Sequence, residues 1–219
     1  MAIFVFFALG VIFLLGFVLG QQFFIARSQR QGLLRAASQF GGRLEDFSWF
    51  ELPRIRMWKR NFEAIVQFSG SGNIGLTTTF RIPWTDSELE CDVRRRRAVE
   101  SIAPFMQEHP IDLAAPLLDD SYLVTGNDES RIRSLFSARV QTALINILAL
   151  PVPFSLDRPD VQFSIADGLV TVTKSGRLTD SYALEIFIRL CAEMHDAALA
   201  AAGRGGVGAN DASESKSCA

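Results

Sequence analysis

Histidine and cysteine are scarce in this sequence. Its 219 residues include two histidines, His109 and His195, and three cysteines, Cys91, Cys191 and Cys218. Two histidines leave little room for a histidine-based metal site, catalytic triad or proton relay. An odd number of widely spaced cysteines argues against a disulfide framework and fits a reducing compartment. This composition argues against an enzyme, and we expect no cofactor.

Net charge is also nearly absent, since the formal value is -2 at pH 7. A protein that binds nucleic acid through bulk charge is usually strongly basic, so we expect no nucleic-acid partner. The length suits one domain of ordinary size with a short additional segment.

Residues 2–20 lack charged side chains altogether. Fourteen of these nineteen residues are Leu, Ile, Val or Phe. A helix rises about 1.5 Å per residue, so twenty-odd apolar residues cover a hydrocarbon core of about 30 Å. A cleaved signal peptide is the alternative, but such peptides begin with a basic region. The sequence therefore predicts a transmembrane anchor over residues 1–25.

The charges that follow this segment predict its orientation. Arg27, Arg30, Arg35 and Arg43 all precede the first acidic residue, Glu45. Because cytoplasmic flanks are enriched in Lys and Arg, we expect a single-pass, signal-anchored protein of the inner (cytoplasmic) membrane with a cytoplasmic domain. Arg27, Arg30 and Arg35 are expected to face lipid headgroups.

Glycine spacing in the same segment allows helix pairing. Gly16 and Gly20 form a G-x-x-x-G pattern, which lets two transmembrane helices approach closely. Glycine is also common in membrane helices for other reasons. A homodimer contact at Gly16 and Gly20 is one hypothesis.

The remainder predicts one α+β domain over residues 43–201. Period-two patterns of aromatic and β-branched residues predict strands, and 3.6-residue periods predict helices. We expect an antiparallel sheet built as a meander, with helices packed on one face. The expected parts are a juxtamembrane helix over 26–42, a β-meander over 43–94, a connector over 95–118, a strand–helix–hairpin–helix unit over 119–201, and a disordered tail over 202–219.

The segment 70–75 has the G-x-G-x-x-G spacing of dinucleotide-binding loops. Such a loop must open a helix, whose N-terminus binds the pyrophosphate. Residues 77–82, Thr-Thr-Thr-Phe-Arg-Ile, instead predict a strand. The segment is therefore interpreted as a hairpin loop.

Cys191 and His195 are spaced by four residues on the last predicted helix. That spacing places both on one helical face, where they could bind zinc or form a thiolate–imidazole pair. Neighbouring Leu184, Phe187 and Ile188 place the same face in the apolar stripe. A buried thiol beside a core histidine is the favoured interpretation.

An acidic group surrounds the short strand predicted near residue 122. It comprises Asp119, Asp120, Asp128 and Glu129, which could coordinate a hard cation if the chain folds back. Asp128 and Glu129 serve equally well as residues that start a helix. We therefore assign no metal ligands and no catalytic residues.

Basic residues are mixed with aromatic ones on one predicted strand, and a basic run follows later. The two groups are Arg54, Arg56, Trp58, Lys59 and Arg60, and Arg94 to Arg97. Such mixtures suit anionic headgroups or single-stranded nucleic acid, although charged strand ends are commonplace.

Residues 122–128, Tyr-Leu-Val-Thr-Gly-Asn-Asp, are followed by a predicted helix, a hairpin at Ala166-Asp167-Gly168-Leu169 and a closing helix. This succession, with a helix ending at Gly41-Gly42 before strands, resembles bacterial membrane-anchored proteins of unknown function over residues 27–200. The resemblance implies the architecture and a bacterial origin, and it implies no site residue.

Three functional hypotheses follow. The first is a membrane-tethered, non-enzymatic interaction or adaptor domain that binds a protein partner or a second copy. The second is a domain that binds lipid or a small ligand at the membrane face. The third is an enzyme with an unrecognised site, for which Cys191, His195 and the group around Asp119 are the candidates.

Overall fold

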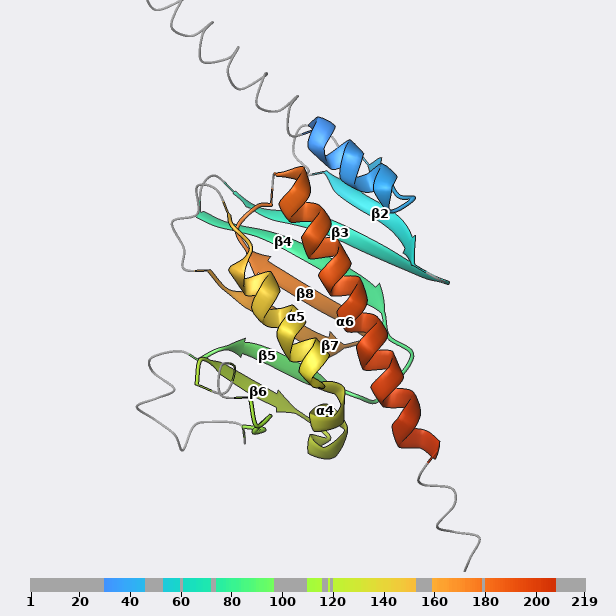
Figure 1. The fold of residues 1–219 in the computed structure, drawn as a ribbon, viewed down its shortest axis with the longest axis vertical. Helices are drawn as coiled ribbons and strands as arrows, with labels where there is room; N and C mark the ends of the chain where they lie inside the picture. Colours follow the sequence, from blue (N-terminus) through green and yellow to red (C-terminus); the bar gives the residue numbers. More distant parts are fainter. Residues whose placement is uncertain are drawn as a thin grey trace, which may run out of the picture.

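A computed structural model describes residues 30–45, 53–59, 61–71, 74–96, 110–115, 118, 120–152, 159–178 and 180–207. Its centre is an eight-stranded antiparallel sheet, and the described helices all lie on one face of that sheet (Figure 1). The described part of the chain is therefore an α+β fold of two layers.

The first half of the sheet is a meander. It consists of β1 (Arg43–Glu45), β2 (Arg54–Lys59), β3 (Phe62–Ser71) and β4 (Ile74–Pro83), and each strand pairs with the next. The G-x-G-x-x-G segment lies where β3 turns into β4, with Ser71 opposite Ile74. A strand follows this turn, so the hairpin interpretation is confirmed.

The second half corrects the expected meander. It contains β5 (Cys91–Arg95), β6 (Tyr122–Gly126), β7 (Val161–Ala166) and β8 (Leu169–Ser175), and the strand order is β1-β2-β3-β4-β8-β7-β5-β6. The sequence predicts β5 as the last strand of the meander, but β8 takes the place beside β4. Alternation shows which residues form strands, whereas long-range packing decides which strands pair.

The helical layer comprises a helix over residues 30–39, α4 (Glu129–Leu135), α5 (Ala138–Ala149) and α6 (Ser181–Val207). The sequence predicts one helix where α4 and α5 occur. Phe136 departs from helical geometry at φ -81° and ψ 51°, and its ring packs edge to face on Phe163 of β7 at 5.4 Å. The chain forms two short helices, α4 and α5, and the residue between them, Phe136, is buried. The helical period of the apolar residues continues through both helices, so it does not reveal the break at Phe136.

The hydrophobic core lies between the two layers. Inward-facing strand residues such as Phe80 and Val172 are 1% and 0% exposed, and Phe187 of α6 is fully buried above them. The helix at 30–39 joins this layer, where Gln39 Nε2 donates to Glu185 Oε1 of α6 at 2.6 Å. Helix α6 therefore ties both halves of the sheet to one core.

The predicted membrane architecture also needs correction. Residues 1–25, including Gly16 and Gly20, lie outside the described residues, as does Arg27. The tail predicted over 202–219 begins later than expected, because α6 continues to Val207; residues 208–219 lie outside the described residues. Among the helices that the structure describes, none combines the length and apolar character needed to cross a bilayer. The sequence predicts a single-pass, signal-anchored protein. This prediction is wrong for the described residues, because they contain no membrane-spanning helix.

Candidate functional site

The sheet face opposite the helices is a band of polar side chains. Cross-strand partners project on the same side of a sheet, so the register defines which residues share this face. One row crosses all eight strands: Arg43, Arg56, Ile65, Arg81, Thr171, Ser164, Asp92 and Thr125. We call the face that carries this row the open face.

Hydroxyl groups occupy the centre of the open face. Ser69 Oγ lies 2.5 Å from Thr77 Oγ1, and Thr79 Oγ1 lies 3.3 Å from Thr173 Oγ1. Both pairs link neighbouring strands, since Thr79 is opposite Thr173 and Ser69 is opposite Thr77. These cross-strand pairs hold the polar surface in a fixed arrangement.

The open face is more basic than the whole chain. Its strand residues include five arginines and three carboxylates, and five minus three gives a net charge of +2, against -2 for the full sequence. The residues are Arg43, Arg54, Arg56, Arg81 and Arg94, with Glu45, Glu63 and Asp92. The charge of this molecule is therefore unevenly distributed.

Two arginines on this face differ in their surroundings. Arg56 Nε lies 3.0 Å from Glu45 Oε1 and 2.9 Å from Glu63 Oε1, so two carboxylates already pair with its charge. Arg81 is exposed at the middle of the sheet, and within the described part of the chain it makes no ion pair. Arg81 is thus available to an incoming acidic group.

The basic and aromatic side chains predicted on β2 lie on both faces of the sheet. Arg54, Arg56 and Trp58 project from the open face, where Trp58 is 65% exposed. Lys59 projects toward the helices and its Nζ lies 3.3 Å from Asp196 Oδ2 of α6. Arg60 lies outside the described residues. Sequence reasoning missed Arg81, although its position between buried Phe80 and Ile82 indicates an outward side chain.

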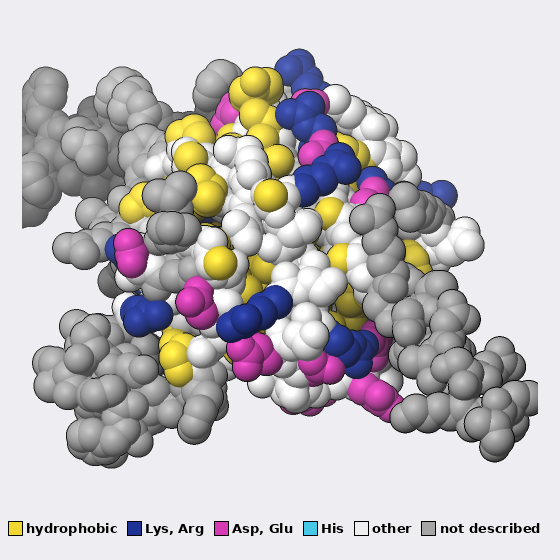
Figure 2. All heavy atoms as spheres, turned by 60° about the horizontal axis from the view of Figure 1, so that its bottom comes forward, with side chains coloured by type: hydrophobic (Ala, Val, Ile, Leu, Met, Phe, Trp, Pro, Cys, Tyr) yellow, Lys and Arg dark blue, Asp and Glu magenta, His cyan; other side chains and the backbone are white. Residues whose placement is uncertain are grey.

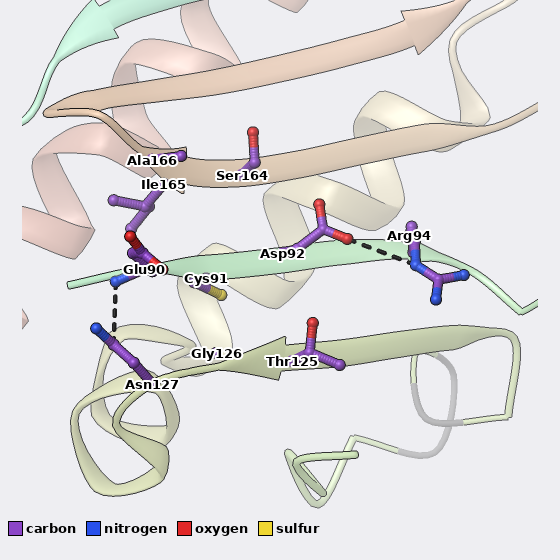
Figure 3. Close-up of a pocket in the computed structure, with 10 residues that line it drawn as sticks. All are labelled: Glu90, Cys91, Asp92, Arg94, Thr125, Gly126, Asn127, Ser164, Ile165 and Ala166. Carbon is purple, nitrogen blue, oxygen red and sulfur yellow. Dashed lines mark hydrogen bonds and ion pairs between the residues drawn. The ribbon is translucent and has the colours of Figure 1, made fainter. Parts of the chain in front are cut away.

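A hollow of about 630 Å³ opens at the β5–β6–β7 end of the open face. Ser164, Asp92 and Thr125 project into it from three adjacent strands, with Arg94 beside them (Figure 3). Arg94 Nε lies 3.7 Å from Asp92 Oδ2. This hollow is the part of the open face where polar groups converge.

Cys191 and His195 do not form an accessible reactive pair. They are 1% and 2% exposed, and burial raises the pKa of the Cys191 thiol well above its usual value. His195 Nε2 lies 3.2 Å from the Pro83 carbonyl oxygen, and its ring packs between Phe62 and Trp84. The interpretation as core residues is confirmed.

The remaining cysteine of the described chain is also enclosed. Burial first, and the charge of Asp92 second, raise the pKa of Cys91 to about 12. A neutral thiol is a poor nucleophile and a poor metal ligand. Neither described cysteine has the properties of a catalytic group.

The described members of the acidic group have other partners or lie exposed. Asp128 Oδ1 caps α4 by accepting from Arg131 N at 3.0 Å, and Glu129 pairs with Arg133 at 2.7 Å. Asp120 is exposed, and Asp119 lies outside the described residues. No cluster of three or more His, Cys, Asp or Glu side chains suited to a metal ion occurs in the described ranges.

The face seen in Figure 2 carries charges of both signs. Lys and Arg side chains alternate there with Asp and Glu, and hydrophobic side chains are scattered among them. Arg30 and Arg35 are exposed on the helix at 30–39, and their predicted contact with lipid headgroups stays a prediction.

Comparison with known proteins adds little. No family model matches the sequence, and no curated protein matches it. Among solved structures, the mycobacterial trehalose monomycolate transport factor A matches with a TM-score of 0.48 and 11% identity, covering 78% of this chain and 93% of that one. Similarity at this level carries no functional information.

Proposed function

We propose that this protein is a non-enzymatic binding protein whose open face docks an acidic surface of a protein partner. The observation that carries the proposal is the in-register row across all eight strands, polar on every strand except β3, where Ile65 stands, with exposed Arg81 at its centre. Arginine and tryptophan are the residue types that most often dominate protein interfaces, and Arg81 and Trp58 both lie on this face. Its positive charge favours association with an acidic partner.

The size of the open face supports the same proposal. Eight strands spaced about 4.8 Å apart span about 34 Å across the sheet. Strands three to ten residues long give a surface of several hundred Å², comparable to the roughly 800 Å² that each partner contributes to a standard interface. One face of this sheet is therefore large enough for a specific complex.

The chemistry of the described chain favours binding over catalysis. The candidates for a nucleophile and a base are the two described thiols and His195, and all three lie in the core. On the open face, hydrogen bonds and ion pairs join polar groups to one another. Fixed donors and acceptors without an activated nucleophile are suited to recognition.

Site-specific photo-cross-linking tests the proposal. A photoreactive amino acid at position 171, in the middle of the open face, should give a discrete adduct in cells expressing the full chain. The control is the same photoreactive amino acid at position 142, an exposed site on α5, which should give no such adduct. Arg81→Glu should reduce the adduct at 171 by about fivefold or more, because like charges across an interface repel. Arg139→Glu, on the exposed side of α5, should leave it unchanged.

Two results would overturn the proposal. One is equal adduct formation at positions 171 and 142, and the other is an adduct at 171 that is insensitive to Arg81→Glu. An adduct that consists of lipid, or that anionic vesicles displace at low salt, would replace the protein partner with an anionic headgroup. The location at the cytoplasmic membrane stays a prediction.

A further inference from the structure

A small pocket lies on the helical side of the sheet, opposite the open face. It measures about 210 Å³ and lies where the helix at 30–39 ends beside α6, over the meander strands (Figure 1). Side chains in protein interiors pack closely and leave few spaces larger than a water molecule. A pocket of this size against the core is therefore a candidate binding site.

Most of the residues that line this pocket are apolar and belong to the core. Met57, Ala64 and Phe80 line it from three neighbouring strands, and all three are buried. Ile188 and Ala192 line it from α6 and are buried as well. Alanine at positions 64 and 192 leaves space that longer side chains would fill.

The end of the helix at 30–39 closes another side of the pocket. Phe40 lines the pocket and is partly buried against the core. The chain then turns at Gly41, whose φ is 64°, and Gly42 N donates to the Ala37 carbonyl oxygen at 2.8 Å. A Cβ at position 42 would lie 2.7 Å from the Arg56 carbonyl oxygen, so a side chain there would push the helix end away from β2. This close approach keeps Phe40 beside the pocket.

The charged side chains around the pocket balance one another. Lys59, Arg189 and Glu193 line it, and Lys59 Nζ lies 3.3 Å from Asp196 Oδ2. Two cations and two carboxylates sum to zero. An ionised ligand would lose its hydration against apolar residues without meeting a net opposite charge, which is unfavourable.

We infer that this pocket binds a small uncharged apolar group, an aromatic ring or a short aliphatic chain. An apolar cavity of about 150 Å³ holds a benzene molecule, whereas drug-sized ligands occupy about 300–1,000 Å³. A volume of about 210 Å³ suits a substituted ring or a chain of similar size. The centre of a protein interface is depleted of charged residues, so the charged border of the pocket favours a small molecule over a partner's side chain. This site is separate from the open face and goes beyond the proposed docking function.

NMR titration of the full-length chain, with labelled alanine and isoleucine methyl groups, tests the pocket. Ethylbenzene should shift the methyl resonances of Ala64, Ile188 and Ala192, and it should leave that of Ala143 on α5 in place. Benzoate and benzylammonium have similar size but carry a charge. Each should bind about tenfold more weakly than ethylbenzene, because each must lose its hydration.

A matched pair of substitutions on α6 tests the location. Ala192→Phe fills the pocket and should weaken ethylbenzene binding by about tenfold or more. Ala200→Phe is the same change at an exposed position and should alter binding by less than about twofold. The photo-cross-linked adduct at position 171 should persist in Ala192→Phe, so the pocket and the docking proposal can fail separately.

Three results would overturn the inference. Ethylbenzene could produce no shifts, it could shift Ala143 as strongly as Ala192, or benzoate could bind as tightly. These readings come from the parent chain, so they hold even if Ala192→Phe does not fold. A protein adduct from a photoreactive amino acid at exposed position 189 would also overturn it, in favour of a partner's side chain.

Competition with vesicles identifies the source of the apolar group. Uncharged phosphatidylcholine vesicles that displace ethylbenzene would support the end of a lipid chain as the natural occupant. Binding of ethylbenzene that these vesicles leave unchanged would support a free small molecule.

Discussion

At the scale of single residues, burial decides which side chains of this protein can react. Cys191 and His195 have a spacing that permits zinc binding or nucleophilic catalysis, yet both are enclosed between the sheet and α6. Lys174 is another buried polar residue, and its Nζ donates to the Leu148 carbonyl oxygen at 3.0 Å near the end of α5. Burial lowers the pKa of Lys174, while the charge of Asp160 opposes this shift. Cys191, His195 and Lys174 are therefore parts of the core, and they do not form a reactive site.

The buried thiols predict a loss of stability in alkaline solution. A thiol whose pKa is raised in the folded state stabilises the fold fully below its unfolded pKa, and this contribution is lost as the pH rises through the folded value. For Cys91 the window runs from about 9 to about 12. One pKa unit corresponds to about 1.4 kcal/mol, so Cys91 alone could remove a few kcal/mol by pH 12.

Urea denaturation at a series of pH values measures this loss. The free energy of unfolding should fall between pH 9 and pH 12, and it should fall less steeply in Cys91→Ala than in the parent chain. Arg139→Ala, at an exposed site, should follow the parent curve. Parallel curves for Cys91→Ala and the parent would show that Cys91 ionises normally in the folded protein.

At the scale of elements, helix starts and tight turns are local features that can be read in the sequence. Asp167 and Gly168 join β7 to β8 with φ values of 52° and 69°, which suits the type I′ turn that Asp-Gly favours. Asp128 caps α4 as its position before Glu129 indicates. The break between α4 and α5 contains no proline. Its local marker is Ser137, which stands at the N-cap position of α5 without a side-chain capping bond, and the break buries Phe136.

The cap at Asp128 is open to a direct test. Asp128→Ala should lower the free energy of unfolding by about 1 kcal/mol, because the Arg131 amide loses its side-chain acceptor. Asp120→Ala removes an exposed carboxylate for which no capping bond is seen among the described residues, and it should change stability by less than about 0.5 kcal/mol. Equal effects of the two substitutions, measured in urea, would contradict a capping role.

At the scale of the whole molecule, β8 and α6 make one cooperative unit from two halves. Strand β8 pairs with β4 of the meander and with β7 of the second half, and α6 packs across both (Figure 1). Unfolding of either half therefore exposes the core of the other. We expect the described domain to unfold in a single transition.

Core truncations in the two halves test this cooperativity. Phe80→Ala in β4 and Phe163→Ala in β7 each remove a ring that is 1% exposed, and each should lower the free energy of unfolding by about 3–5 kcal/mol. Tryptophan fluorescence and far-UV circular dichroism should give coincident urea transitions in both variants. Two separate transitions in either variant would show that the halves are independent.

Several features of the fold and the candidate site follow from the sequence by itself. Alternating side chains mark the strands, apolar stripes mark the helices, and Asp-Gly marks the hairpin, because these signals depend on neighbours only a few residues apart. The same alternation predicts that Arg54 and Arg56 share one side of β2. The helix stripe around Cys191 indicates burial.

Only the tertiary structure decided which of these parts meet. Strand β8 displaces β5 from the meander because pairing depends on packing between segments about a hundred residues apart. That order brings Asp92, Ser164 and Thr125 into one row and creates the hollow, and it places Arg81 at the centre of the open face. Local periodicity shows that these side chains project outward. Their neighbours across the sheet are determined by the long-range contacts that bury the opposite face.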